Sequence, residues 1–121
     1  MDQSKITILV AEDNASNYKL LEVILSKDYN LVHAWNGREA VELFKEHQPQ
    51  LILMDIEMPE MNGYEATDAI RKISSSVPIL ALTAYAYASD QEKILQSGMN
   101  TYMSKPINFH LLRQRILELL G

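Results

Sequence analysis

The chain has 121 residues, a length that favours one domain, residues 1–121, and is sufficient to bury a core of its own. Because 47% of the residues are hydrophobic and 22% are charged, the composition is that of a globular protein rather than a disordered one. The sequence contains no cysteine, which excludes disulfides, thiolate metal sites and cysteine nucleophiles.

Eleven basic against sixteen acidic side chains give a formal charge of −5, so we expect no direct binding to nucleic acid. The longest apolar stretch, residues 6–11, is too short to span a bilayer and lacks the features of a signal peptide. These properties predict a cytoplasmic domain that makes no membrane contact.

Apolar runs predict five buried strands. Their continuous apolar character is typical of a parallel sheet that is covered on both faces. The expected strands are residues 6–11, 31–35, 51–54, 77–82 and 101–103.

Between these runs, apolar residues recur at helical spacing. The shared faces are Tyr18, Leu21 and Leu25; Ala40, Leu43, Phe44 and His47; Ala66, Ile70 and Ile73; and Phe109, Leu112, Ile116 and Leu119. A further helix over residues 87–97 has only a weak stripe, Ile94 and Leu95, so we expect it to be the most loosely held.

Capping patterns support these helices, because a capping side chain stands three residues before Glu at Asn36, Asn62 and Ser89. Five strand–helix units with right-handed crossovers predict an α/β fold. We expect a (βα)5 doubly wound, five-stranded parallel sheet with the flavodoxin-like strand order 2-1-3-4-5 and helices on both faces.

Ligands of such sheets bind outside the carboxyl ends of the strands. The side chains expected there are Glu12 and Asp13 after the first strand, Asp55 after the third, Thr83 after the fourth and Lys105 after the fifth. Each has an ordinary structural explanation when taken alone: a helix-dipole acid, a turn residue, a strand threonine or a solvated lysine.

Together these side chains predict a phosphoryl-transfer site. Neighbouring parallel strands lie about 4.8 Å apart, so acids that end two adjacent strands crowd one another unless a cation neutralises them. Mg²⁺ suits a site with a few carboxylates. Lys105 and Thr83 would then supply donors to an oxyanion, beside a carboxylate that can act as nucleophile.

Four segments, in this order, resemble those of response-regulator receiver domains, the CheY-like superfamily of two-component signalling. They are residues 9–14, residues 53–59 with Gly63, residues 82–84, and Lys105-Pro106. The similarity covers essentially the whole chain. Asn14 and Asn17 resemble receiver domains of hybrid sensor histidine kinases in particular.

The resemblance implies that Asp55 is the phosphoacceptor for a phosphohistidine of a histidine kinase or histidine phosphotransfer domain. It implies an Mg²⁺ site, with Mn²⁺ as an alternative, formed by Glu12, Asp13, Asp55 and the backbone carbonyl of Glu57. Such a domain catalyses only its own phosphorylation and dephosphorylation and is not classed as an enzyme. It would be a monomer or a weak, phosphorylation-dependent dimer.

The resemblance also assigns roles after transfer. Thr83 and Lys105 would each bind a phosphoryl oxygen, and a cis bond is expected before Pro106. Movement of Thr83 would let Tyr102 turn inward, changing the surface formed by the fourth helix, the fifth strand and the fifth helix.

Two further residues, Glu57 and Tyr85, match family positions that flank the phosphoryl pocket. There they would tune the attack of water and therefore the lifetime of the phosphorylated state.

Three other functions are alternatives to phosphoacceptance at this site. An aspartyl-phosphate phosphohydrolase of the haloacid dehalogenase type needs a second Asp where this chain has Glu57, and a cap domain. A flavodoxin-like cofactor binder would not place Glu12 and Asp13 in its phosphate loop. A receiver-like interaction module that is not regulated by phosphorylation remains the alternative.

Overall fold

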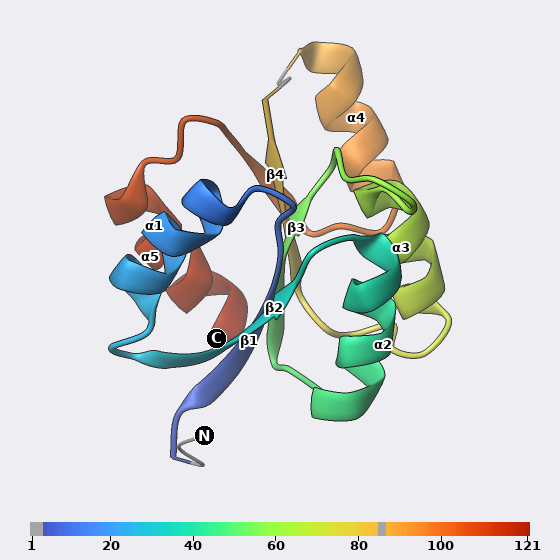
Figure 1. Cartoon of the computed structure of the whole chain (residues 1–121). Coiled ribbons are helices and arrows are strands. Elements are labelled where there is room, and N and C mark those ends of the chain that lie inside the picture. Colours follow the sequence, from blue (N-terminus) through green and yellow to red (C-terminus); the bar gives the residue numbers. More distant parts are fainter. Residues whose placement is uncertain (1–3, 85–86) are drawn as a thin grey trace.

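The structure, a computed structural model, describes residues 4–84 and 87–121 and has the predicted alternation of strands and helices (Figure 1). The strands are β1 (Ile6–Ala11), β2 (Tyr29–Ala34), β3 (Leu51–Asp55), β4 (Ile79–Thr83) and β5 (Thr101–Ser104). All pairings are parallel, and the order β2-β1-β3-β4-β5 confirms the prediction. The helices are α1 (Ala15–Leu25), α2 (Gly37–His47), α3 (Gly63–Arg71), α4 (Ala88–Gln96) and α5 (Phe109–Leu120).

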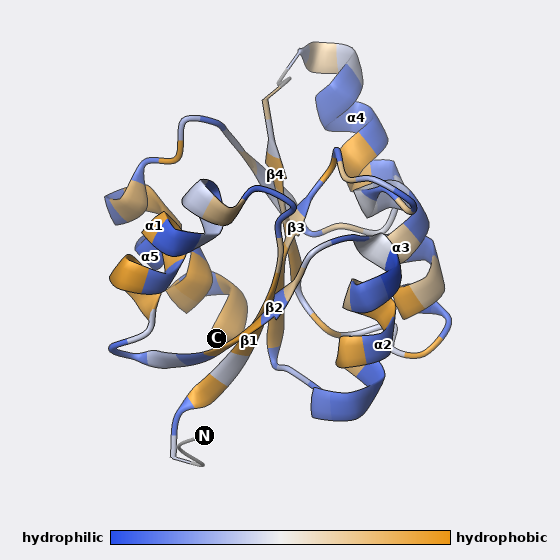
Figure 2. Cartoon of the chain, in the orientation of Figure 1, coloured by the Kyte–Doolittle hydropathy of each residue, from blue (hydrophilic) through white to orange (hydrophobic). Residues whose placement is uncertain are grey.

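Helices cover both faces of the sheet: α1 and α5 lie on one side, and α2, α3 and α4 on the other (Figure 1). Alternate residues of each strand supply the two cores. In β3, for example, Leu51 and Leu53 pack with α1 and α5, whereas Ile52 and Met54 pack with the opposite layer. Because both of their faces are buried, the central strands β1, β3 and β4 consist mostly of apolar residues, and Figure 2 shows mostly hydrophobic colours along them.

Asparagine side chains cap most of the helices. Asn36 accepts the backbone N–H of Glu39, and Asn62 forms a complete capping box with Glu65, as predicted. Asn14 and Asn108 cap α1 and α5 in the same way and were missed because no Glu stands three residues later. The predicted cap at Ser89 is wrong: α4 begins at Ala88, after Tyr87, without a side-chain cap.

Several predicted boundaries and faces require correction. Strand β2 begins at Tyr29 instead of residue 31, and β4 begins two residues later than predicted, after Pro78. His47 and Leu95 are exposed, and Ile73 lies beyond the end of α3, also exposed. These residues fit helical spacing but stand where no neighbouring element covers them. In the described part of the chain, no helix has the length and apolar character needed to cross a membrane.

Arg71 connects the end of α3 to the segments around β4 and β5. Its Nε donates to the carbonyl of Gly98 at 2.9 Å, and its two other nitrogens donate to the Ser74 carbonyl and the Asn100 side chain. Asn100 Oδ1 also accepts the backbone N–H of Ile79, at 2.9 Å. One guanidinium therefore fixes three chain segments on the side of the sheet that α3 covers.

Replacing Arg71 by Leu is expected to lower the free energy of unfolding by about 2 kcal/mol, because partly buried acceptors lose their donors. Urea unfolding followed by circular dichroism measures this change. The control is Lys72→Ala, whose side chain is 77% exposed and pairs with Asp68 on the surface; this change should cost less than about 0.5 kcal/mol. Equal losses of unfolding free energy in the two variants would contradict a stabilising role of the Arg71 hydrogen bonds.

Candidate functional site

Three carboxylates meet at the carboxyl ends of two neighbouring strands. Glu12 and Asp13 follow β1, and Asp55 is the last residue of β3. One ligand oxygen from each of the three lies within 4.8 Å of the others. Glu12 is 1% exposed and Asp55 is 4% exposed, whereas Asp13 faces solvent. The crowding of acids predicted from strand adjacency is therefore present.

Lys105 lies between the two buried acids. Its Nζ is 3.2 Å from Glu12 Oε1 and 3.1 Å from Asp55 Oδ2. The backbone N–H of Lys105 donates to the Thr83 carbonyl, which fixes this residue beside the end of β4. The Lys105–Pro106 bond is cis, as expected. Burial alone would lower the pKa of the Lys105 ammonium, but the charges of Asp55 and Glu12 outweigh it and raise that pKa.

At Glu12, burial is the largest influence on the pKa. Burial raises the pKa of its carboxyl group, and the hydrogen bond and negative charge of Asp55 raise it further. The charge of Lys105 and the N–H of Asn14 compensate only in part. The cluster therefore has an excess of negative charge around oxygen donors. This donor set fits a hard divalent cation such as Mg²⁺.

The loop after β3 holds the Asp55 carboxylate from its other side. Asp55 Oδ1 accepts the backbone N–H of Glu57 at 3.2 Å, and the N–H of Gly63 donates to the Ile56 carbonyl at 2.9 Å. A methyl group on Gly63 would collide with the Asp55 carbonyl oxygen, so only glycine allows this close approach. The start of α3 thus supports the loop that carries the central acid.

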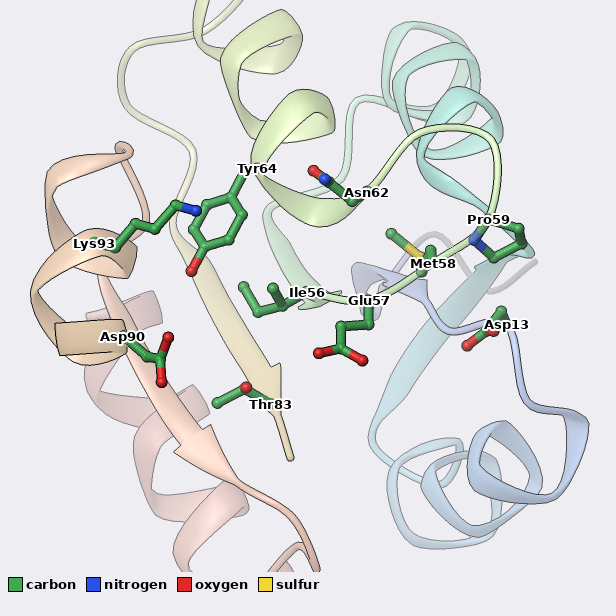
Figure 3. A pocket seen from close by; sticks show the side chains of 10 residues that line it. All are labelled: Asp13, Ile56, Glu57, Met58, Pro59, Asn62, Tyr64, Thr83, Asp90 and Lys93. Carbon is green, nitrogen blue, oxygen red and sulfur yellow. The ribbon is translucent and has the colours of Figure 1, made fainter. Parts of the chain in front are cut away.

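A cleft of about 720 Å³ opens beside the acid cluster (Figure 3). Asp13, Glu57 and Thr83 line it from the ends of β1, β3 and β4, and Thr83 itself is buried. On the far wall, Lys93 Nζ lies 4.5 Å from the centre of the Tyr64 ring. The cleft gives a small group access to the cluster from solvent.

The two predicted switch residues lie on adjacent strands. Thr83 ends β4, and Tyr102 lies on β5, opposite Ala81. Tyr102 is half-buried against the core beneath α2, α3 and α4 and also lines a surface hollow of about 390 Å³. Tyr85, predicted to tune the phosphorylated lifetime, lies outside the described residues.

His33 on β2 also contacts this site, although no motif in the sequence marks it. Its Nε2 lies 2.8 Å from the backbone oxygen of Glu12, and its ring is stacked on Tyr18. It lies one position before the end of β2 and is therefore not among the residues that follow the strands. Its register partner is Val10, two residues before Glu12, so knowledge of the pairing would have indicated the contact.

Parallel β–α units with an acid cluster at the ends of the central strands are the features of the CheY-like fold. The family model of the response regulator receiver domain matches residues 8–117, and the chain belongs to this family. It is therefore a receiver domain of two-component signalling.

Relatives of two architectures are similar to the chain. Hybrid signal transduction histidine kinase I of Dictyostelium discoideum is 42% identical over 90% of this chain, which spans only 7% of that protein. The polar-differentiation response regulator DivK of Brucella anthropi is 38% identical over 95% of this chain and 96% of its own length.

Solved receiver structures are similar as well. The receiver domain of Ssk1 from Saccharomyces cerevisiae, solved with the histidine phosphotransfer protein Ypd1, has a TM-score of 0.89 and 38% identity. That comparison covers 95% of this chain and 88% of the other. Chemotaxis protein CheY4 of Vibrio cholerae has a TM-score of 0.90 and 25% identity over 95% of this chain and 98% of its own.

Glu12→Gln is expected to stabilise the metal-free protein at neutral pH, because burial and the neighbouring Asp55 disfavour the charged form of the Glu12 carboxyl group. Because the folded state raises the pKa of Glu12 above 4.5, this group favours folding below pH 4.5 and loses that contribution as the pH rises through its folded pKa. The advantage of the variant over the unmodified protein should therefore grow from pH 4 to neutrality. Urea unfolding with a chelator present, across this pH range, measures it.

The control for this prediction is Glu46→Gln, since the Glu46 side chain is 71% exposed. Its stability difference from the unmodified protein should stay near zero across the range. A Glu12→Gln difference that does not depend on pH would contradict the raised pKa.

Proposed function

We propose that residues 1–121 act as one receiver domain in which Asp55 accepts a phosphoryl group from the phosphohistidine of a histidine kinase or histidine phosphotransfer domain. The observation that carries this proposal is the placement of Asp55. Its carboxylate ends a central strand, lies within 4.8 Å of two other acids and is held by Lys105 and the Glu57 N–H. Membership of the receiver-domain family supports phosphoryl transfer as the class of reaction.

In the proposed transfer, a carboxylate oxygen of Asp55 attacks phosphorus. The new P–O bond forms as the P–N bond breaks, and the electron pair returns to the imidazole nitrogen of the donor. Lys105, already 3.1 Å from Asp55 Oδ2, is placed to donate to a phosphoryl oxygen. The Thr83 hydroxyl would bind another, because Thr83 lines the cleft beside Asp55.

Glu12, Asp13, Asp55 and the carbonyl of Glu57 would hold Mg²⁺, or Mn²⁺ in its place. A divalent ion bound there offsets the negative charge of the phosphoryl oxygens. Glu12 and Asp13 would supply their carboxylates from the residues directly after β1, and Asp55 would supply its own from the end of the neighbouring strand β3.

The output step we propose depends on Thr83 and Tyr102. Drawing the Thr83 hydroxyl toward the phosphoryl group would free space near β5, into which Tyr102 can turn. The surface of α4, β5 and α5 would change as a result. Tyr102 starts half-buried between the core and a surface hollow, a position from which a ring can move either way.

A partner surface adjoins the site. A small hollow of about 160 Å³ is lined by Glu12 and Lys105 together with Leu20 of α1 and Ile107. Leu20 and Val23 of α1 are more than half exposed. The yeast complex with Ypd1 supports a histidine phosphotransfer domain as the partner. We propose a cytoplasmic domain that binds no nucleic acid and is a monomer or a weak, phosphorylation-dependent dimer.

Acetyl phosphate with Mg²⁺ is expected to add one phosphoryl group to the protein, because Asp55 is the nucleophile. Intact-mass spectrometry measures the increment, which should disappear without Mg²⁺ and in Asp55→Asn. The matched control is Asp68→Asn, whose side chain is 74% exposed on α3; it should be phosphorylated like the unmodified protein.

An unmodified protein that binds Mg²⁺ but gains no mass would instead favour the interaction module that is not regulated by phosphorylation. Phosphorylation retained in Asp55→Asn would place the acceptor elsewhere. Rapid turnover of free phosphate esters would favour the phosphohydrolase.

Glu57→Ala is expected to change the rate of dephosphorylation by at least about threefold, or about 0.7 kcal/mol in activation free energy. The exposed Glu57 side chain faces the cleft through which water would reach the phosphoryl group (Figure 3). Decay of the phosphorylated mass after removal of acetyl phosphate measures the rate. Tyr85→Ala tests the second proposed tuning residue, and unchanged decay in both variants would refute the tuning role.

A further inference from the structure

The segment that carries the acid pair is held to β2 through both backbone groups of one residue. The N–H of Glu12 donates to the Ala34 carbonyl at 3.0 Å. Its carbonyl oxygen lies 2.8 Å from His33 Nε2. A carbonyl can only accept, so Nε2 of His33 carries the proton and donates it. The Glu12 backbone thus contacts β2, while its carboxylate contacts Lys105, the residue directly after β5.

Aromatic contacts fix the His33 ring in this position. Tyr18 of α1 stacks on it with the ring centres 3.7 Å apart and the planes 1° from parallel. Trp35 contacts it at 4.2 Å with a 43° tilt. An imidazole held by two rings keeps its donor directed at the Glu12 carbonyl with little loss of side-chain entropy on bonding.

We propose that His33 is a positioning residue for the divalent-metal site: it fixes the Glu12–Asp13 peptide and thereby the placement of Asp13 relative to Asp55. This inference rests on the proposed function, because it concerns the metal site described there. His33 lies outside the carboxylate cluster and acts only through the backbone. The Glu12 carbonyl is also the carbonyl of the peptide that leads into Asp13, so rotation of that peptide displaces the Asp13 carboxylate.

A role limited to folding does not account for this arrangement. His33 is half-buried on β2, which is an edge strand of the sheet. Without His33, water can satisfy the Glu12 carbonyl, so the fold should persist. Metal affinity should be more sensitive than folding stability, because tight binding requires the carboxylates to be aligned in advance. Hydrogen bonds that orient metal ligands typically contribute about tenfold or more to the affinity.

Two variants separate the donor from the ring. His33→Phe keeps a ring that can stack on Tyr18 but removes the donor. His33→Gln removes the ring but supplies an amide N–H that can reach the Glu12 carbonyl. The exposed histidine of α2 provides the control, His47→Phe. The probe is Mg²⁺ itself, titrated into ¹⁵N-labelled protein, with dissociation constants taken from the amide shifts of residues 12–14 and 55.

His33→Phe is expected to weaken Mg²⁺ binding by about tenfold. His33→Gln should recover most of this loss, and His47→Phe should bind like the unmodified protein. Urea midpoints of all three variants should lie close together. With saturating Mg²⁺, acetyl phosphate should still add one phosphoryl group to His33→Phe, since Asp55 and Lys105 are intact.

Equal Mg²⁺ affinity, within twofold, in the unmodified protein and His33→Phe would overturn the positioning role while leaving the proposed function in place. Equal losses in His33→Phe and His33→Gln would also overturn it, because the donor would then not matter. Absence of Mg²⁺ binding in the unmodified protein would overturn both proposals at once.

Discussion

The structure of the site depends on one interaction, the Lys105 ammonium placed between Glu12 and Asp55. The two acids end neighbouring strands and are buried together, an arrangement that repels itself without a cation. Lys105, which follows β5, supplies one positive charge to both acids. Since one ammonium faces three carboxylates, the cluster keeps an excess of negative charge. That excess suits a divalent ion, and the same lysine can later pair with an added anion.

The fold delivers these charges through the order of its strands. The parallel sheet brings the ends of β1, β3 and β4 to the same edge, and helices on both faces exclude water beneath them. Support comes from residues without reactive groups. Gly63 allows α3 to approach the Asp55 carbonyl, and Ala34 accepts the N–H of Glu12. The chemistry of the edge therefore depends on packing and backbone contacts as much as on the acids.

The strands, and the presence of Glu12, Asp13, Asp55 and Lys105 at their ends, could be predicted from the sequence, because apolar runs are local patterns. That these side chains cluster followed only once the strands were taken to be neighbours in a parallel sheet. The contact between His33 and Glu12 could not be predicted, since it requires the register of β2 on β1. Ser89 failed as a cap for a related reason. Its spacing to Glu92 fits the capping pattern, but α4 begins one residue earlier. Short patterns identify elements well and their ends poorly.

Helix α4 has fewer buried residues than any of the other four helices. Among its residues, Ala88–Gln96, only Ile94 is fully buried, and Lys93 contacts the ring of Tyr64. Displacing this helix would expose one large aliphatic side chain, about 1.5–3 kcal/mol of hydrophobic free energy. A few new hydrogen bonds to a charged group have comparable strength. Helix α4 also lines the cleft through Asp90 and Lys93, so the element beside the site is the one held by the least buried apolar surface.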